Sequence, residues 1–174
     1  MELSEKYGNA SVGFVDCDVT KEESVERLMN EAEKMFNSPV HCVVNNAGVM
    51  GEKEGWKLCP DINQIGVVHG TNNAIKRMRK DEGGLGGVVV NVASILGLFC
   101  GTQPKGWQYN TSKSAVVTLS RCLGNKANYD DTGVRIVCLC PSVTKTPILN
   151  GCTEEELKDM KKEDWRIHDI RCRG

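Results

Sequence analysis

The sequence VVVNVAS at residues 88–94 decides the fold class, because a short run rich in valine is typical of a strand buried within a parallel sheet. It follows the glycine-rich sequence GGLGG at residues 83–87, which lacks the GK[ST] of a phosphate-binding loop and is expected to be a turn. Three similar apolar runs occur in the chain: SVGFVDC at 11–17, VHCVV at 40–44 and VRIVCLC at 134–140. We therefore expect four buried strands.

The segments between these runs have the periodicity of amphipathic helices. The first is preceded by Thr20 and Glu23, which form a capping-box pattern. Its apolar residues recur every three or four positions, at Val25, Leu28, Met29, Ala32, Met35 and Phe36. A second helix is marked by Ile62, Ile65, Val68, Ile75 and Met78, and a third, over residues 109–127, by Ala115, Val116, Leu119 and Leu123. Alternating strands and helices predict an α/β fold with a parallel sheet covered on both faces.

Composition excludes several classes of protein. A length of 174 residues corresponds to about one domain. The 22 basic and 23 acidic residues give a net charge of −1, which argues against binding to nucleic acid or to an anionic membrane surface. No apolar run is long enough to cross a bilayer, and residues 1–11 lack the apolar core of a secretory signal. We therefore expect a cytoplasmic protein that acts on a small molecule.

The nine cysteines are expected to be reduced thiols, because no secretory signal accompanies them. Four of them fall in or beside apolar runs, where a thiol packs as a small hydrophobe: Cys17, Cys42, Cys138 and Cys140. The sequence has no C-x-x-C pair and only three histidines, so we expect no metal site. The basic residues within 76–80 leave two interpretations open, a solvated helix C-terminus or a patch for phosphate or RNA.

Polar or small residues follow each of the four expected strands. Ligands of open α/β sheets bind at the carboxyl ends of the strands, which lie at one edge of the sheet. The residues expected there are Asp18 and Val19 after the first strand, residues 45–48 (NNAG) after the second, Ser94 at the end of the third and residues 141–146 after the fourth.

Tyr109 and Lys113 add a candidate acid/base pair. Positions i and i+4 of a helix share one face, so the two side chains are expected to meet. An ammonium beside a phenol favours the phenolate, and this would lower the pKa of Tyr109 toward the working range. Ser94, 15 residues earlier, could hold a substrate oxygen while Tyr109 moves the proton. Such a trio suits interconversion of an alcohol and a carbonyl compound, with a nicotinamide carrying the hydride.

At these residues the chain resembles the short-chain dehydrogenase/reductase family. The motifs are NNAG at residues 45–48, Ser94 at a strand end and YNTSK at 109–113, which matches the family's Y-x-x-x-K. The segments FVDCDVT, GGLGGVVVNVASILGL and VRIVCLCPSVTKT look most like the NAD-dependent 15-hydroxyprostaglandin dehydrogenase branch. The resemblance implies a Rossmann-like, doubly wound parallel sheet in residues 1–150, with 151–174 as a charged C-terminal helix or tail.

The resemblance also implies roles for individual residues. Tyr109 would be the catalytic acid/base, Ser94 would orient the substrate oxygen, and Lys113 would tune Tyr109 and hold the nicotinamide ribose. Asn63 would support a water-linked proton path to the lysine. The remaining cofactor contacts would be Cys17, Asp18 and Val19 at the adenine, Asn46 beside the cofactor, and Thr144, Lys145 and Thr146 at the carboxamide and pyrophosphate. The cofactor would be NAD, with NADP not excluded, and a complete version of the protein would be a homodimer.

Simpler interpretations stay open for two of these residues. Asn63 could cap or kink its helix, and Asp18 could be a turn residue or a helix N-cap. The sequence also departs from the family pattern. No T-G-x-x-x-G-x-G turn precedes residue 11, the closing strand is missing, and Ser142 stands where the family usually has glycine.

These departures predict an incomplete fold that lacks the first βαβ unit and the last strand, and weak binding of NAD by this chain. Two hypotheses about function result. The first is an NAD(P)-dependent oxidoreductase that interconverts a secondary alcohol and a ketone. The second is a truncated, catalytically inactive fragment or isoform that acts, if at all, as a partner-binding module.

Overall fold

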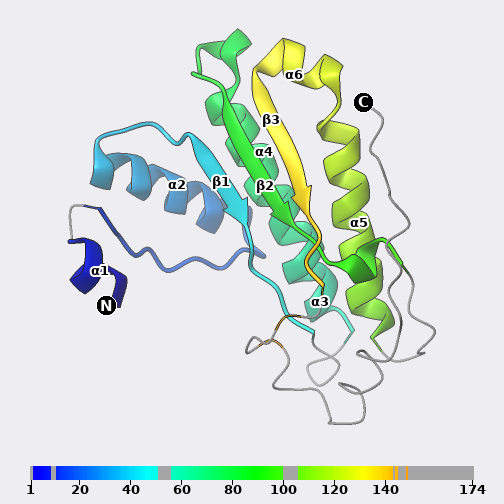
Figure 1. Cartoon of the computed structure of the whole chain (residues 1–174). Coiled ribbons are helices and arrows are strands. Elements are labelled where there is room, and N and C mark those ends of the chain that lie inside the picture. The colour runs from blue at the N-terminus through cyan, green and yellow to red at the C-terminus, as the bar shows by residue number, and fades with distance from the viewer. Residues whose placement is uncertain are drawn as a thin grey trace.

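Three parallel strands form the centre of the structure, in the order β1-β2-β3. The computed structural model describes residues 2–8, 11–50, 56–99, 106–142, 144 and 148. The strands are β1 (Cys42–Asn45), β2 (Gly87–Val92) and β3 (Val134–Leu139), shown in Figure 1. The register places Asn45 opposite Asn91, and Asn91 opposite Cys138. The predicted α/β class and three of the four expected strands are confirmed.

Helices connect the strands, as the periodicity predicts. The α-helices are α1 (Glu2–Tyr7), α2 (Glu22–Phe36), α3 (Leu58–Pro60), α4 (Gly66–Met78), α5 (Trp107–Leu123) and α6 (Lys126–Thr132). A π-helical turn, η1 (Asp61–Ile65), joins α3 to α4, and two 3-10 turns are η2 (Lys80–Glu82) and η3 (Ile95–Gly97). The expected helix within 151–174 lies outside the described residues. In the part of the chain that the structure describes, no helix is long and apolar enough to span a membrane.

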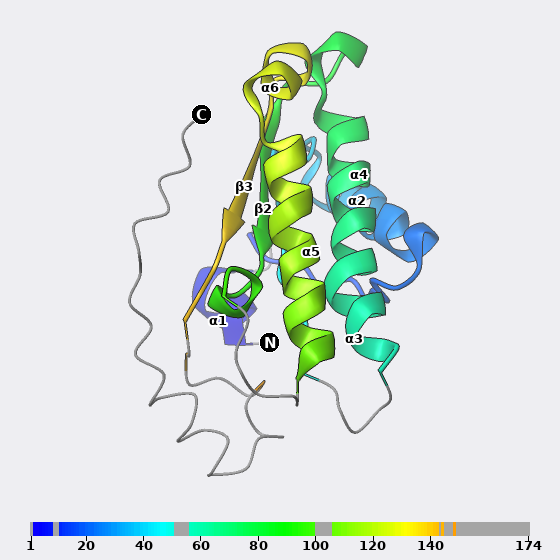
Figure 2. The same ribbon diagram turned by 90° about the vertical axis from the view of Figure 1, so that its right-hand side faces the viewer.

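The described helices pack against one face of the sheet. Figure 2 shows α4 and α5 on the same side of β2 and β3. On that side, Val89 is fully buried and packs with Val25 and Met29 of α2. On the other side, Val44 is 56% exposed and Leu139 is 54% exposed. The expectation of a sheet covered on both faces is therefore wrong for the described residues, because every helix that packs on these strands lies on one side.

Residues 11–17 do not form the predicted strand. They follow an irregular path, and Phe14 is 86% exposed. A strand requires a hydrogen-bonded neighbour, and this segment pairs with none of the three described strands. An apolar, β-branched composition indicates only that a segment can be buried. It does not show whether a neighbouring strand is present to pair with it. Cys17 and Val19 nevertheless pack against the core that contains Val89.

The predicted capping box is also wrong. Helix α2 begins at Glu22 with Lys21 at the N-cap, and no side chain caps it. Thr20 instead donates its hydroxyl and its backbone N–H to Asp18 Oδ1, at 2.7 and 3.1 Å. Asp18 therefore holds a local turn before the helix, as the simpler interpretation of this residue predicted.

Two of the basic residues within 76–80, Arg77 of α4 and Arg79 after it, form ion pairs within the chain. Arg77 donates to Glu33 Oε2 of α2 at 2.9 Å, and Arg79 pairs with Asp81 at 2.6 Å and with Glu82 at 3.1 Å. These ion pairs favour the interpretation as an ordinary helix end over a phosphate or RNA patch.

Buried polar side chains join the sheet to two helices. Asn91, with no exposed surface, accepts from Asn45 Nδ2 at 2.8 Å and from Thr71 Oγ1 of α4 at 3.2 Å. It donates to Ser120 Oγ of α5 at 3.0 Å. Gly70 of α4 lies so close to Asn45 that an added Cβ would overlap the amide oxygen, so a side chain there would push α4 away from β1. These contacts fix the positions of α4 and α5 along the length of the strands.

The one-sided sheet makes a prediction about stability. Val89→Ala removes two buried carbons and should lower the free energy of unfolding by about 2 kcal/mol. Val137→Ala removes the same atoms from the open face, where Val137 is 40% exposed, and should cost less than about 0.5 kcal/mol. Urea denaturation of the two variants measures both values. Equal losses would show that the open face is buried in solution.

Candidate active site

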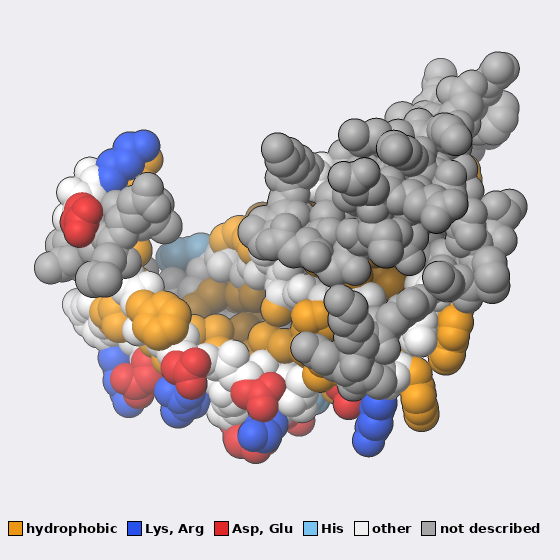
Figure 3. Space-filling model, turned by 90° about the horizontal axis from the view of Figure 1, so that it is seen from below, with side chains coloured by type: hydrophobic (Ala, Val, Ile, Leu, Met, Phe, Trp, Pro, Cys, Tyr) orange, Lys and Arg blue, Asp and Glu red, His pale blue; other side chains and the backbone are white. Residues whose placement is uncertain are grey.

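The strands end at one edge of the sheet, and Figure 3 looks at this edge from below. Hydrophobic side chains gather along a hollow in the middle of this face, and acidic and basic side chains lie along one rim. Ser94 follows β2 here and is 8% exposed. Its Oγ accepts the backbone N–H of Leu96 at 3.2 Å, so Ser94 caps the turn η3. This bond holds the serine side chain at the end of the sheet.

Helix α5 brings Tyr109 and Lys113 to the same place. The Tyr109 hydroxyl is hydrogen-bonded to Ser94. Lys113 Nζ lies 5.6 Å from the centroid of the Tyr109 ring. The two side chains lie one turn apart on α5, as their spacing predicts. The structure therefore brings Ser94, Tyr109 and Lys113 into one cluster.

Lys113 is a buried cation, with 3% of its surface exposed. Its Nζ donates to the carbonyl oxygen of Val92, the last residue of β2, at 2.7 Å. Burial lowers the pKa of Lys113, and the nearby thiols of Cys59, Cys138 and Cys140 oppose this effect. The lysine is thus fixed by the end of the strand rather than extended into solvent.

The pKa of Tyr109 differs from the sequence expectation. Burial raises the pKa of Tyr109 above its ordinary value, and the hydrogen bond from Ser94 opposes that rise in part. The expected lowering by Lys113 is absent from this chain, because the ammonium faces the ring and donates to Val92 rather than to the phenol oxygen. Without a further charge in the site, Tyr109 therefore stays protonated at neutral pH.

Asn63 lies inside the π-helical turn η1 and is fully buried. Its Oδ1 accepts the backbone N–H of Val49 at 2.8 Å, and its Nδ2 donates to the carbonyl oxygen of Val49 at 2.9 Å. The same Nδ2 lies 3.2 Å from Ser112 Oγ of α5. Asn63 thus ties the loop after β1 to two helices, and π-turns of this kind often occur at functional sites.

Gly48, the last residue of NNAG, passes between Asn63 and Lys113. A Cβ added at Gly48 would lie 3.3 Å from Asn63 Oδ1 and 3.6 Å from Lys113 Nζ. The first of these contacts is tighter than usual, so glycine at position 48 avoids crowding against Asn63. Asn46, two residues earlier, is exposed at the end of β1.

A small pocket lies between β1 and the helices α2 and α4. Its volume is about 130 Å³, and it is lined by residues that include Cys17, Val19, Asn46, Ile62 and Gly66. Three of the predicted cofactor contacts, Cys17, Val19 and Asn46, are thereby brought together. Asp18, in contrast, is exposed, and its carboxylate pairs with Lys21 at 3.2 Å.

The segment after β3 is described only in part. Thr144 is exposed, and its hydroxyl donates to the carbonyl oxygen of Ser142 at 3.0 Å. The other two predicted residues, Lys145 and Thr146, lie outside the described residues.

Sequence reasoning missed two members of the site, Cys59 and Ser112. Asn63 Nδ2 lies 3.0 Å from Cys59 Sγ, and Cys59 Sγ lies 3.8 Å from Ser112 Oγ. Burial raises the pKa of Cys59, so its thiol stays neutral. The spacing of Cys59 and Asn63, i and i+4, is the signal that could have placed them on one helical face.

Curated relatives have similar sequences. Alcohol dehydrogenase 1 of Ceratitis capitata is 34% identical over 162 residues, which cover 92% of this chain and 61% of the relative. The 15-hydroxyprostaglandin dehydrogenase [NAD(+)] of Rattus norvegicus is 34% identical over 155 residues, which cover 88% of this chain and 56% of the relative. The chain thus spans about three fifths of the length of these relatives.

Solved structures share the fold. A short chain dehydrogenase from Mycobacterium smegmatis superposes with a TM-score of 0.66 at 28% identity, over 82% of this chain and 61% of that one. The NADPH-dependent 3-quinuclidinone reductase of Rhodotorula rubra gives 0.67 at 26% identity, over 84% and 55%. The incomplete Rossmann-like fold is therefore confirmed. Residues 1–157 also match the family of short chain dehydrogenases, and with the cluster of Ser94, Tyr109 and Lys113 this match shows that the chain belongs to that family.

Proposed function

We propose that this chain carries the proton-transfer site of a nicotinamide-dependent oxidoreductase that interconverts a secondary alcohol and a ketone. One observation carries the proposal: Ser94, Tyr109 and Lys113 converge at the carboxyl end of β2, with Tyr109 bonded to Ser94 and Lys113 beside its ring. The names of the relatives, alcohol dehydrogenase and 15-hydroxyprostaglandin dehydrogenase, support the same class of reaction.

Each residue of the cluster has a distinct task in this proposal. Ser94 donates a hydrogen bond to the substrate oxygen and holds it near the phenol of Tyr109. Tyr109 takes the hydroxyl proton when an alcohol is oxidised and returns it when a ketone is reduced. Lys113 would hold the ribose, and it would favour the tyrosinate once its ammonium turns from the Val92 carbonyl toward the phenol oxygen. Asn63 holds the loop after β1 in place.

The residues present fit a nicotinamide nucleotide. Gly48 places no side chain beside Lys113, where a ribose would meet the ammonium. The pocket of about 130 Å³ at Cys17 and Val19 is smaller than a typical ligand site, so it suits one ring system, the adenine, rather than a whole dinucleotide. When bound, the nicotinamide supplies the hydride acceptor or donor. We assign Asn46 to the same cofactor surface, and Thr144, Lys145 and Thr146 to its carboxamide and pyrophosphate by resemblance.

NAD is the cofactor that we propose, rather than NADP. The name of the prostaglandin dehydrogenase relatives includes NAD(+), although the Rhodotorula reductase is NADPH-dependent. Asp18 would contact the adenine by resemblance. Its carboxylate is exposed beside the pocket residues Cys17 and Val19, and it keeps a negative charge because hydrogen bonds from Thr20 lower its pKa.

One buried polar atom near Tyr109 in the chain lacks a hydrogen-bond partner among the described residues. Gln108, directly before Tyr109, has a buried Oε1 that bonds to no group among the described residues. A buried acceptor without a donor is costly, so this oxygen is suited to accept a hydroxyl or N–H of a bound substrate. A secondary alcohol with a second donor group fits this arrangement.

The cluster predicts different outcomes for two substitutions in active protein. Tyr109→Phe removes the transferable proton, so turnover should be abolished while NADH affinity stays largely unchanged. Lys113→Arg keeps the charge but changes the shape and hydration of the group, so both activity and NADH affinity should fall. Fluorescence titration with NADH and steady-state kinetics measure the two effects.

Two results would contradict these roles. Comparable turnover by the Tyr109→Phe variant would show that another group moves the proton. Normal NADH binding by Lys113→Arg, with only a displaced pH optimum, would show that the lysine tunes Tyr109 but does not hold the ribose.

The hydrogen bond between Ser94 and Tyr109 predicts a pH effect. Alcohol oxidation needs Tyr109 as a base, so its rate should rise with pH through the pKa of Tyr109. Ser94→Ala removes a bond that lowers this pKa, so the pKa should increase and the rising limb should move to higher pH. Thr111→Ala, an exposed change on the same helix, is the control and should leave the profile in place. If the rising limb of the Ser94→Ala profile moves to lower pH or does not move, the hydrogen bond from Ser94 does not lower the pKa of Tyr109.

A further inference from the structure

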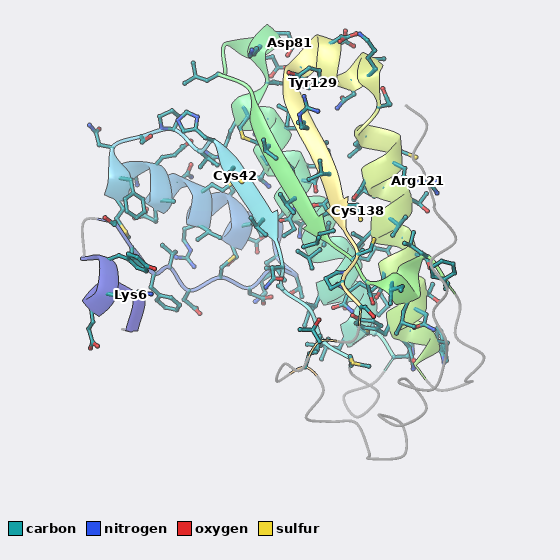
Figure 4. All side chains as sticks on the ribbon, in the orientation of Figure 1. Lys6, Cys42, Asp81, Arg121, Tyr129 and Cys138 are labelled. Atoms are coloured by element: carbon teal, nitrogen blue, oxygen red, sulfur yellow. The ribbon has the colours of Figure 1, made fainter. Side chains whose placement is uncertain are left out.

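Two thiols outside the proposed proton-transfer cluster lie close together at the end of β3. Cys138 Sγ and Cys140 Sγ are 3.8 Å apart, because residues i and i+2 of an extended chain point to the same side. Both residues are partly exposed. Figure 4 labels Cys138 on β3, on the side where α5 packs. A small oxidant could therefore reach the pair without unfolding the chain.

The surroundings of Cys138 favour a thiolate. Cys140 Sγ, 3.8 Å away, has the strongest influence on the pKa of Cys138, and Ser120 and the backbone at Ala93 lower this pKa further. The titratable groups that face Cys138 are Cys140 on its own segment and the cationic Lys113 on α5, whereas β2 contributes the uncharged Ala93 and Asn91. Together these groups lower the pKa of Cys138 to about 6, against the opposing effect of burial.

We propose that Cys138 and Cys140 form a peroxide-sensitive dithiol, in which Cys138 is the thiol that is oxidised first and Cys140 the thiol that resolves it. This site is separate from the proposed alcohol chemistry and does not depend on it.

The reaction uses hydrogen peroxide as the oxidant and proceeds in two steps. The Cys138 thiolate attacks one peroxide oxygen, so an S–O bond forms, the O–O bond breaks and hydroxide leaves to be protonated to water. Cys140 then attacks the resulting sulfenic sulfur, so the S–S bond forms and a second water leaves with the Cys140 proton. Two thiols lose two electrons in total, and one peroxide is reduced to two waters.

The two steps require both sulfurs, and the structure offers contrasting thiols for comparison. Cys59 is fully buried and burial raises its pKa, so it should resist oxidation. Cys122 on α5 is an exposed free thiol. If exposure alone governed reactivity, Cys122 would react before Cys138.

The expected difference in oxidation rate between Cys138 and an ordinary thiol can be calculated for pH 6. About half of Cys138 would be thiolate there, against roughly 0.3% of an ordinary thiol, which is about a 150-fold advantage. A thiolate of lower pKa is a weaker nucleophile, and this offsets about tenfold of the advantage. We therefore expect the pair to react about ten times faster than Cys122.

Peptide mapping of the native chain tests this directly. The chain is treated with hydrogen peroxide at pH 6, alkylated and digested with trypsin. Both cysteines fall in the peptide of residues 136–145, which contains no other cysteine. This peptide should lose about 2 Da and escape alkylation about ten times faster than Cys122 is modified, and dithiothreitol should restore its mass. Oxidation of Cys122 at the same rate or faster would overturn the proposal.

Two variants assign the order of events. In Cys140→Ser, the disulfide should not form, and Cys138 should instead be trapped as sulfenic acid by dimedone. In Cys138→Ser, dimedone should label residue 140 several times more slowly. The reverse pattern would show that Cys140 is oxidised first. Wild-type chain in 8 M urea is the control for folding, and a dithiol that reacts there as fast as in native protein would show that the folded surroundings contribute nothing.

Discussion

Asn91 makes the hydrogen bonds on which the arrangement of the site depends. From the middle strand it bonds Asn45 of β1, Thr71 of α4 and Ser120 of α5, and none of its surface is exposed. A buried amide without hydrogen-bond partners would be strongly destabilising. These elements therefore pack stably only in positions along the strands that let Asn91 make its hydrogen bonds. Closer to the strand ends, the same packing places Lys113 against Val92 and Tyr109 beside Ser94.

Low solvent exposure then sets the chemistry of each group at this edge. Burial raises the pKa of Tyr109 and lowers that of Lys113, because burial disfavours the charged form of each side chain. Four groups around Cys138, with Cys140 the strongest, outweigh the same effect of burial at that thiol. Tyr109 and Cys138 therefore differ because polar neighbours favour the thiolate, while the Lys113 ammonium lies over the phenol ring and not beside its oxygen.

Much of the fold follows from the sequence, because strands β1, β2 and β3 and helices α2, α4 and α5 lie where the apolar runs and the helical periodicity predict them. The predicted apolar faces are only partly buried, since Met35, Phe36 and Ile65 are exposed. The segment at 11–17 was wrongly predicted as a strand, since composition cannot show whether a partner strand exists. The cluster of Ser94, Tyr109 and Lys113 could be predicted from i, i+4 spacing and from the strand end. The orientation of the lysine could not, because it depends on a backbone carbonyl, Val92, that has no sequence signature. The Asn63 contacts with Val49 were hidden for the same reason.

The central claim is that this edge of the sheet supports hydride transfer between a secondary alcohol and a nicotinamide, with Tyr109 moving the proton. The most direct measurement uses a secondary alcohol labelled with deuterium at its carbinol carbon, with NAD as the acceptor and mass spectrometry of the reduced nicotinamide. We predict one deuterium in each NADH formed, together with one equivalent of ketone. Reduced cofactor without deuterium, or ketone formed without reduced cofactor, would contradict the account.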